Sequence, residues 1–427
     1  MKQATIGIIS LGCPRNLVDS QNLLGSFQAK GYKIVDIQKA DIGLVNTCSF
    51  IEDAKKESID AILDLVALKK EGRLKKIIVA GCLSQRYKEA LLPQLKEVDA
   101  FIGTRGLGNE ADKSYNLIPR HIAYLKISEG CNHPCTFCVI PKIKGKLQSR
   151  AMEALFEEAQ GLEAKGISEL NIIGQDISHY GLDIYKKARL SLLLRGMCAS
   201  LKKIHWIRLL YLHPNHVTDG LIDVIANEEK ICKYVDVPLQ HISSRVLKAM
   251  KRQTTTKRIL HFLSRLRKKI PGVALRTSLI VGFPGETEKE FKQLLSFVKE
   301  QKFERLGVFK YSREEGTPAY EYAGQIPQRL KAERFKALMQ LQQRISLEFN
   351  RKLIGREFEV LIDGKSSGAR YCGRLAIDAP EVDGAVYVSA DRELKPGEFV
   401  RVKITDAYEY DVAGRHIPLT QEQKKSA

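Results

Sequence analysis

The chain has 427 residues, nine cysteines and a formal net charge of +19. This length exceeds one ordinary hydrophobic core, so two or three domains are expected. No apolar run approaches the roughly 20 residues that cross a bilayer, and an odd number of widely spaced cysteines does not fit a secreted disulfide scaffold. We therefore expect a cytoplasmic protein, without a membrane partner, whose cysteines are free or bind metal.

Elements typical of βαβ units come first, because short β-branched runs alternate with amphipathic stretches from residue 4 to about 104. The expected strands are Thr5–Leu11, Ile42–Asn46, Lys76–Ala80 and Ala100–Gly103, and the expected helices lie near Asn16–Lys30, Glu52–Lys70 and Gln85–Lys96. Residues 105–122 contain Gly, Asn and Pro without a clear period and are interpreted as a linker. We expect an α/β domain at 1–118 with a doubly wound parallel sheet.

A second alternating series predicts a partial, parallel β/α barrel at residues 119–350. Its strands are expected at Ile122–Ser128, Glu169–Gly174, Trp206–Tyr211, Tyr234–Pro238, Ala274–Gly282 and Arg305–Phe309. Apolar residues at helical spacing predict a helix over 328–352. Beyond it, the alternating segments Glu357–Ile362, Ala385–Ser389 and Phe399–Ala407 predict a small β-barrel at 351–420.

Three thiols lie close together at Cys131, Cys135 and Cys138, directly after a strand-like run. Thiolates on so short a loop can converge on one iron–sulfur cluster. Three ligands leave one iron without a protein donor, and an open coordination position is where substrates bind in catalytic metal sites. The alternatives are buried free cysteines or a zinc knuckle, for which His133 would have to fold back between two ligands.

Three further cysteines, Cys13, Cys48 and Cys82, each stand at the carboxyl end of an expected strand and before a helix. In an open parallel sheet these ends share one edge, where ligands gather, so the three thiols are expected to meet. The pattern predicts a second three-thiolate site. The alternative is that they are small residues packed in the core. The remaining cysteines lack this placement and are interpreted as structural: Cys198, Cys232 and Cys372.

The segment GCNHPCTFC at Gly130–Cys138 resembles the signature of the radical S-adenosylmethionine (SAM) superfamily. The segments SLGCPRNLVDS at Ser10–Ser20, NTC at Asn46–Cys48 and GC at Gly81–Cys82 resemble the three cysteine motifs of the methylthiotransferase family. Members of that family combine this amino-terminal domain with a radical SAM core and a carboxyl-terminal TRAM domain. The resemblance covers nearly the whole chain.

The resemblance implies two [4Fe–4S] clusters. One, on Cys131, Cys135 and Cys138, would bind SAM at its open iron and, with an electron from a donor, split it into methionine and a 5′-deoxyadenosyl radical. The other, an auxiliary cluster on Cys13, Cys48 and Cys82, would carry the sulfur to be transferred. Two sites suit the chemistry, because an unactivated C–H bond requires a radical and the resulting carbon radical then requires a sulfur donor.

Contacts to SAM are expected at the carboxyl ends of the barrel strands, where catalytic residues of such folds usually lie. The polar candidates there are Gln175, Asp176, Arg208, Gln240 and Arg276. Each is equally well explained as a satisfied polar residue at the end of a strand.

The family divides into enzymes that modify adenosine in transfer RNA and enzymes that modify an aspartate in ribosomal protein twelve of the small subunit. Four segments resemble the ribosomal-protein branch: LGCPRNL at Leu11–Leu17, RLLY at Arg208–Tyr211, PLQHIS at Pro238–Ser243 and DAPEVDG at Asp378–Gly384. The resemblance implies delivery of a methylthio group to the β-carbon of that aspartate.

Charge gives a separate reason for the same branch. An RNA-binding TRAM barrel should be basic, because phosphate neutralisation dominates nucleic-acid affinity, yet residues 360–411 hold 10 acidic and 7 basic side chains. Asp378, Glu381 and Asp383 would offer a basic ribosomal protein an acidic surface, although a solvated loop explains them equally well. The surplus of positive charge lies in residues 1–350, which could meet ribosomal RNA.

Three alternatives remain open. The chain could be a different radical SAM enzyme that uses its TRAM domain to bind RNA. The chain could modify adenosine in transfer RNA, which the basic body would attract. It could also be a non-catalytic iron–sulfur sensor that binds RNA through its basic face. Such a sensor would lose little on losing SAM binding and would produce no 5′-deoxyadenosine.

Overall fold

The computed structural model describes residues 3–104, 115–366 and 370–418. The amino-terminal domain is a five-stranded, all-parallel sheet in the order β2-β1-β3-β4-β5. Its strands are β1 (Thr5–Ser10), β2 (Lys33–Ile34), β3 (Ile42–Thr47), β4 (Lys76–Gly81) and β5 (Ala100–Ile102). Its helices are α1 (Pro14–Ala29), α2 (Glu52–Lys70) and α3 (Cys82–Leu91).

Side chains that alternate along these strands pack into two separate hydrophobic cores, one on each face of the sheet. Ile6 and Leu44 pack with Leu24 of α1 on one face of the sheet. On the other face, Val45 and its neighbours pack against Ile62 of α2. Because successive strand residues point to opposite faces, both faces need a helical cover. The predicted doubly wound arrangement is confirmed.

The central domain is a partial barrel of six parallel strands. They form two three-stranded sheets, β6-β9-β10 and β11-β12-β13, linked by a parallel bridge between Ile207 and Ile231. The strands are β6 (Ile122–Lys126), β9 (Glu169–Ile173), β10 (Trp206–Leu209), β11 (Tyr234–Asp236), β12 (Ala274–Val281) and β13 (Arg305–Lys310). A short antiparallel pair joins β7 (Ser128–Glu129) to β8 (Gln148–Ser149).

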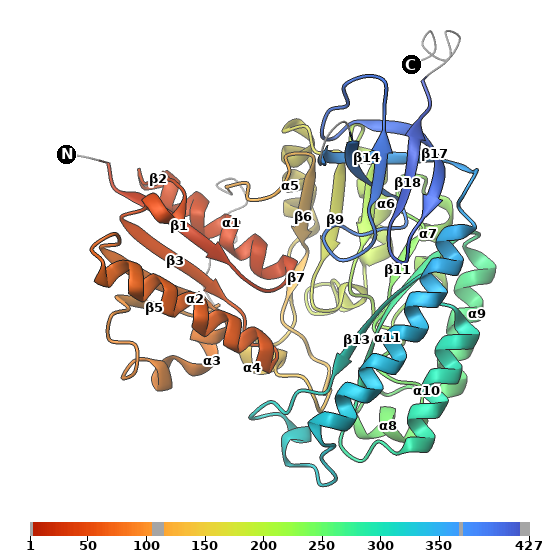
Figure 1. Cartoon of the computed structure of the whole chain (residues 1–427), viewed down its shortest axis with the longest axis horizontal. Coiled ribbons are helices and arrows are strands. Elements are labelled where there is room, and N and C mark those ends of the chain that lie inside the picture. Colours follow the sequence, from red (N-terminus) through yellow and green to blue (C-terminus); the bar gives the residue numbers. More distant parts are fainter. Residues whose placement is uncertain (1–2, 105–114, 367–369, 419–427) are drawn as a thin grey trace.

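All but one of the helices of this domain contribute apolar side chains to one large core shared with the strands. The helices are α4 (Ile140–Lys144), α5 (Met152–Ala164), α6 (Leu190–Ser200), α7 (Asp219–Asn227), α8 (Ser244–Ala249), α9 (Thr256–Lys269), α10 (Glu288–Gln301) and α11 (Gln328–Arg351). The exception is α4, which instead packs Ile143 against Cys82 of the amino-terminal domain. The predicted helix at 328–352 corresponds to α11, which leads from the barrel into the last domain (Figure 1).

The last domain is a closed five-stranded barrel in the order β14-β15-β16-β18-β17. Its strands are β14 (Glu357–Lys365), β15 (Arg370–Leu375), β16 (Val386–Ser389), β17 (Phe399–Ala407) and β18 (Val412–His416). The sequence predicted three of them and missed β15 and β18. Each of those two contains a central glycine, and at Gly373 and Gly414 an added Cβ would lie 2.5 Å from another atom of the barrel, so close packing replaces the usual apolar alternation there.

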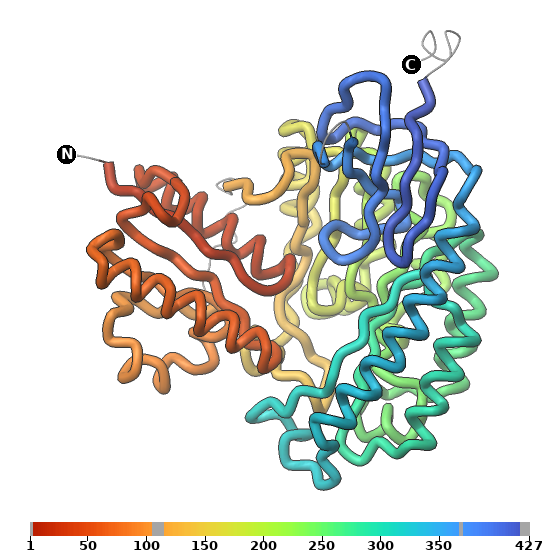
Figure 2. The backbone as a smooth tube through the Cα atoms, in the orientation of Figure 1, coloured from red at the N-terminus to blue at the C-terminus, as the bar shows by residue number. Residues whose placement is uncertain are grey.

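The three units meet around the central barrel (Figures 1 and 2). The small β-barrel covers the amino ends of the central strands, whereas the amino-terminal domain lies against the cavity at their carboxyl ends. The boundaries 1–118, 119–350 and 351–420 stay a prediction, and most of the predicted linker lies outside the described residues. Within the described part of the chain, no helix has both the length and the apolar character needed to cross a membrane.

Candidate active site

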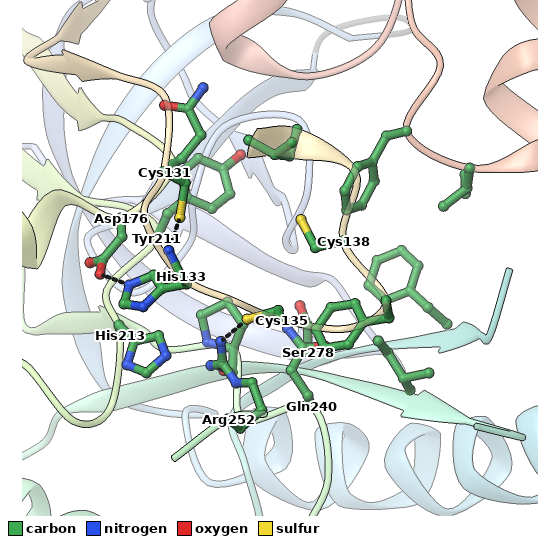
Figure 3. Close-up of a pocket in the computed structure, with 18 of the residues that line it drawn as sticks. Cys131, His133, Cys135, Cys138, Asp176, Tyr211, His213, Gln240, Arg252 and Ser278 are labelled. Atoms are coloured by element: carbon green, nitrogen blue, oxygen red, sulfur yellow. Dashed lines mark hydrogen bonds and ion pairs between the residues drawn. The ribbon is translucent and has the colours of Figure 1, made fainter. Parts of the chain in front are cut away.

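A cavity of about 290 Å³ lies at the carboxyl ends of the central strands. Figure 3 shows the thiols of Cys131, Cys135 and Cys138 around it. Arg15 and Phe50 of the amino-terminal domain also line it. Parallel strands collect their following loops at one edge, which is why segments so far apart in sequence share this space.

The cysteine loop is held on both sides by backbone hydrogen bonds. The Cys131 N–H donates to the carbonyl of Gly145 at 3.1 Å, and the Thr136 N–H donates to the carbonyl of Met250 at 3.1 Å. Gly130 has φ +76°, and a Cβ there would lie 2.1 Å from the carbonyl oxygen of Lys146. Only glycine therefore permits this entry into the loop.

Burial favours the protonated form of two thiols of this loop when no metal is bound. Burial raises the pKa of Cys131 to about 11 and that of Cys138 to about 12. Arg252 donates through Nη1 to Cys135 Sγ at 3.6 Å and through Nη2 to the carbonyl of Pro238 at 2.7 Å. Metal binding deprotonates such thiols, so their protons leave when a cluster forms.

The second cysteine set lies where the sequence predicted it. Cys13 precedes α1, Cys48 follows β3, and Cys82 is the first residue of α3. At Gly12, which has φ +93°, an added Cβ would lie 2.9 Å from Cys48 Cβ and 3.1 Å from its Sγ. The absence of a side chain at Gly12 thus lets the segment that carries Cys13 approach Cys48.

Arg15 joins this set to the cavity. Its guanidinium donates to the carbonyl of Gly174 at 2.8 Å and lies 4.5 Å from the centre of the Tyr211 ring. Burial is the largest single effect and opposes ionisation of Cys13, but the positive charge of Arg15 and hydrogen bonds from Arg15 and Asn16 together lower the pKa of that thiol. By contrast, burial raises the pKa of Cys48 and that of Cys82, the latter to about 12.

Three of the five residues predicted to contact SAM line the cavity: Gln175, Asp176 and Gln240. Gln175 donates through Nε2 to Glu129, and its Oε1 is buried without a hydrogen-bond partner. Gln240 has φ +71° and bonds through its backbone to Ser278 of β12. Asp176 accepts a hydrogen bond from Ser178 N–H at 2.9 Å.

The other two, Arg208 and Arg276, lie in strand interiors and face the opposite end of the barrel, so the prediction that they contact SAM is not supported. Arg208 is fully buried, with its Nε 2.8 Å from a carboxylate oxygen of Glu169. Arg276 pairs with Asp236 at 3.1 Å. Arg276 is the third of the eight residues of β12, far from its carboxyl end. Arg208 is the third of the four residues of β10, but its guanidinium donates to the carbonyl of Ala376 in the last domain and does not line the cavity.

The acidic segment of the last domain pairs with arginines of the central barrel, which corrects the expectation of an exposed acidic surface. Asp378 is 2% exposed and accepts from Arg305 Nε at 2.6 Å. Asp383 lies 3.4 Å from Arg276 and accepts from the Tyr234 hydroxyl at 2.6 Å. Of the three predicted residues, Glu381 is exposed. The carboxylates thus fasten the small β-barrel to the central one.

Sequence reasoning missed a group of histidines beside the cysteine loop. His133 Nε2 lies 2.6 Å from Asp176 Oδ2, the contact drawn in Figure 3. His213 lines the cavity, and the ring centres of His179 and His216 are 3.8 Å apart. The sequence did carry a signal for this group, because His179 follows Asp176 by three residues and His216 follows His213 by three residues. Both pairs lie just beyond a strand.

A buried ionic cluster between α1 and the central domain was also missed. Asp19 of α1 accepts from Lys126 Nζ at 2.5 Å and from Lys144 Nζ at 2.8 Å. Lys126 lies 2.9 Å from Glu129, which in turn accepts from Gln175. No local pattern pairs residues more than 100 positions apart. The cluster fixes the amino-terminal domain against the wall of the cavity.

Comparisons with known proteins agree with this architecture. Residues 5–103 match the uncharacterized protein family UPF0004, residues 125–298 match the radical SAM superfamily, and residues 354–417 match the TRAM domain. A solved structure of the radical SAM methyltransferase TsrM from Kitasatospora setae, with cobalamin and a [4Fe–4S] cluster bound, has a TM-score of 0.54 at 14% identity. The match covers 87% of this chain and 81% of that one, and it shows the fold alone.

Curated relatives are much more similar in sequence. The ribosomal protein uS12 methylthiotransferase RimO of Caldanaerobacter subterraneus subsp. tengcongensis is 50% identical, over 96% of this chain and 99% of the relative. RimO of Geobacter sulfurreducens is 46% identical, over 96% of this chain and 98% of the relative. RimO of Clostridioides difficile is 45% identical over similar spans. On this similarity, which extends across all three domains, the chain belongs to the RimO family of radical SAM methylthiotransferases.

Proposed function

We propose that the chain delivers a methylthio group to the β-carbon of an aspartate in ribosomal protein uS12. The names of the relatives at 45–50% identity support this substrate. The observation that carries the proposal is the shared cavity, because the cysteine loop and side chains of the amino-terminal domain face the same space. A radical formed at one thiol set and sulfur held at the other must reach one carbon atom, and this arrangement allows it.

Two clusters form part of the proposal. Cys131, Cys135 and Cys138 would hold a [4Fe–4S] cluster that SAM completes, and Cys13, Cys48 and Cys82 would hold a second one. The donor chemistry fits, since all six thiols are free, Cys131, Cys135 and Cys138 line the cavity, and Arg15 links the segment of Cys13 to it. When bound, the first cluster would supply the electron that cleaves SAM, and the second would supply the sulfur.

The chain's own residues have three tasks in this scheme. Arg15 favours the thiolate form of Cys13 and links that segment to the strand end at Gly174. Gln175 and Gln240 are proposed to contact SAM, and the unpartnered Oε1 of Gln175 offers it a hydrogen-bond acceptor. Asp176 is already engaged by His133 and Ser178, so its carboxylate supports the wall of the cavity and is not free for SAM.

The mouth of the cavity offers apolar surface to a protein substrate. Phe50 of the amino-terminal domain is 41% exposed and Phe309 of β13 is 46% exposed, and both line the cavity. Exposed aromatic side chains are enriched where proteins bind one another. A substrate loop that covers them would exclude water from a reactive radical.

Two further partners and a cellular location follow from this proposal. An electron donor must reduce the first cluster, because the protein residues described here supply no low-potential electron. Ribosomal RNA would meet the positive surplus of residues 1–350 if uS12 is modified within the ribosomal subunit. The same substrate would place the chain in the cytoplasm with the ribosome.

The test is a reaction of the anaerobically reconstituted protein with SAM, a chemical reductant and purified uS12, analysed by mass spectrometry of uS12 peptides. We expect a methylthio group on one aspartate. In parallel, ribosomal proteins and transfer RNA from cells with and without the gene should differ at uS12 alone. Methylthiolated adenosine with unmodified uS12 would favour the transfer RNA alternative and overturn the proposal.

A further inference from the structure

Four side chains capable of binding a metal ion gather in the wall of the cavity. His133 comes from the cysteine loop, Asp176 and His179 follow β9, and His216 follows β10. One ligand atom from each lies within 4.8 Å of the ligand atom of every other. Three separate segments therefore contribute nitrogen or oxygen donors to one small volume.

The distances within the group suit a four-coordinate metal ion. Asp176 Oδ2 is 2.6 Å from His133 Nε2 and 3.6 Å from His179 Nδ1. Zinc bound at about 2.1 Å by four ligands in a tetrahedron sets those ligands roughly 3.4 Å apart. The observed separations lie on both sides of that value, so small side-chain rotations would bring the donors onto a common centre.

A second observation points to a missing ligand. His216 Nε2 is buried and has no hydrogen-bond partner, although buried polar atoms are nearly always partnered. The ligand atoms of the other three side chains all lie within 4.8 Å of the ligand atom of His216. The Ser178 backbone and hydroxyl both donate to Asp176 Oδ1, which leaves Oδ2 directed at the histidines.

An outer layer holds the donors in place. The His213 ring stacks on the His133 ring with centres 4.3 Å apart, and His213 Nδ1 accepts from the Asn215 N–H at 3.3 Å. Metal-binding side chains are usually oriented by such neighbours. The donors are also well shielded, with side-chain exposures of 11% for His133, 7% for Asp176 and 17% for His179.

We propose that His133, Asp176, His179 and His216 bind a divalent transition metal ion, with zinc as the ion that imidazole and carboxylate donors favour. Four protein ligands make a closed site, which is characteristic of a structural metal. The ion ties the loop that carries Cys131 and Cys135 to the ends of β9 and β10. This assignment is independent of the proposed function, because it requires neither SAM nor substrate.

The test uses the full chain with its clusters reconstituted, one equivalent of zinc, removal of loose metal by a weak chelator, and counting of zinc and iron per chain. X-ray absorption at the zinc edge then reports the zinc ligands without interference from iron. We expect about one zinc per chain, nitrogen and oxygen neighbours at about 2.0–2.1 Å and no sulfur at about 2.3 Å. Iron content should not change.

Variants locate the site. His179→Ala and His216→Ala should each weaken zinc retention by about 10-fold or more, since even outer-layer changes around a metal reach that size. His205→Gln is the matched control, because His205 also pairs with a carboxylate, Glu359, at 2.8 Å but stands in another part of the fold. The control should retain zinc like the parent chain.

Three results would overturn the proposal: no retained zinc in the parent chain, a zinc–sulfur shell that places the ion on cysteines, or undiminished zinc in both histidine variants. The first two are measured on the unaltered chain and so do not depend on how the variants fold. Unchanged iron content and circular dichroism verify that any loss of zinc in a variant is local.

Discussion

The two ends of the central barrel are both rich in polar side chains but use them differently. At the carboxyl ends of the strands, Gln175 and Gln240 border an open cavity beside three cysteines. At the amino ends, the carboxylates of Glu169, Asp378 and Asp383 are matched by buried arginines, and the small β-barrel covers them. The first end borders the cavity that holds the cysteine loop, whereas at the second end the small β-barrel packs over the ion pairs.

This difference shows that a buried polar group can indicate either an interface or a ligand site, depending on whether it has a partner. A charged group that is fully paired inside a protein is part of the packing, and breaking the pair leaves an uncompensated charge. At the cavity end, the Gln175 Oε1 and His216 Nε2 atoms are buried without hydrogen-bond partners. At the amino end Arg208 Nη2 also lacks one, but the rest of its guanidinium is held by Glu169 and by the carbonyl of Ala376. Unsatisfied groups beside a cavity indicate a ligand site, and satisfied ion pairs indicate an interface between domains.

The largest effect should come from removing the cavity's own thiols. Replacing Cys131, Cys135 and Cys138 together with Ala should reduce SAM cleavage to background while the iron of the other site remains, because the electron that cleaves SAM has no other source. Iron analysis and chromatographic measurement of 5′-deoxyadenosine check both parts. Continued 5′-deoxyadenosine formation in this variant would contradict the assignment of the cavity.

Replacing Cys13, Cys48 and Cys82 with Ala tests the amino-terminal side of the same cavity. SAM cleavage should remain measurable while sulfur transfer to uS12 is lost, since the radical and the sulfur are held at different sites. Mass spectrometry of uS12 and assay of 5′-deoxyadenosine distinguish the two activities. Normal methylthiolated uS12 from this variant would make these three cysteines structural.

At the amino ends of the central strands, replacing Glu169 with Gln should lower the stability of the protein. Glu169 pairs with both Arg208 and Arg374, so the change should lower the free energy of unfolding by about 3–5 kcal/mol. Urea unfolding followed by fluorescence of Trp206, the single tryptophan, reports this interface because its ring lies 4.9 Å from Phe399 of the small β-barrel.

The control for that measurement is Glu357→Gln, which breaks an exposed pair with Arg401. Such a surface pair contributes about 0–1 kcal/mol, so the unfolding curve should shift little. SAM cleavage by the folded fraction of Glu169→Gln should match the parent chain. Equal stability of the two variants would show that the amino end of the barrel is not held by its ion pairs.

The smallest effect is expected at the exposed carboxylate of the acidic segment. Glu381→Lys should change stability by less than about 0.5 kcal/mol, as is usual for surface substitutions. We also expect unchanged capture of uS12, because the other two carboxylates face inward. Weaker association that recovers as salt rises, measured across a salt series, would instead restore this segment as a steering surface.

Local spacing was enough to predict where the cysteines lie in the fold, while their role as cluster ligands stays a prediction. Cys131, Cys135 and Cys138 share one short loop, so covalent geometry alone keeps their thiols close. Cys13, Cys48 and Cys82 are far apart in sequence, but the rule that parallel strands end at one edge brings them together. The three domains followed from similarly local patterns, since alternating strands and helices indicate parallel sheets and short alternating strands indicate a small barrel.

Strand ends alone did not assign the charged residues correctly. Arg208 and Arg276 look like ligands at strand ends, and Asp378 and Asp383 look like an exposed acidic loop. Whether a strand residue faces the cavity depends on the pairing register of the strand and on what packs against it. Here the last domain, which is distant in sequence, packs against the two arginines.

By itself, the sequence determined the domain order, the placement of the six cysteines in the fold and the family, because these depend on spacing within short segments and on the general topology of parallel strands. Only the tertiary structure decided which charges are buried in pairs, that Arg15 reaches the strand end at Gly174, and that His133, His179 and His216 gather with Asp176. These contacts join residues from separate loops and domains, and their partners are selected by packing in three dimensions, of which a linear pattern carries no record.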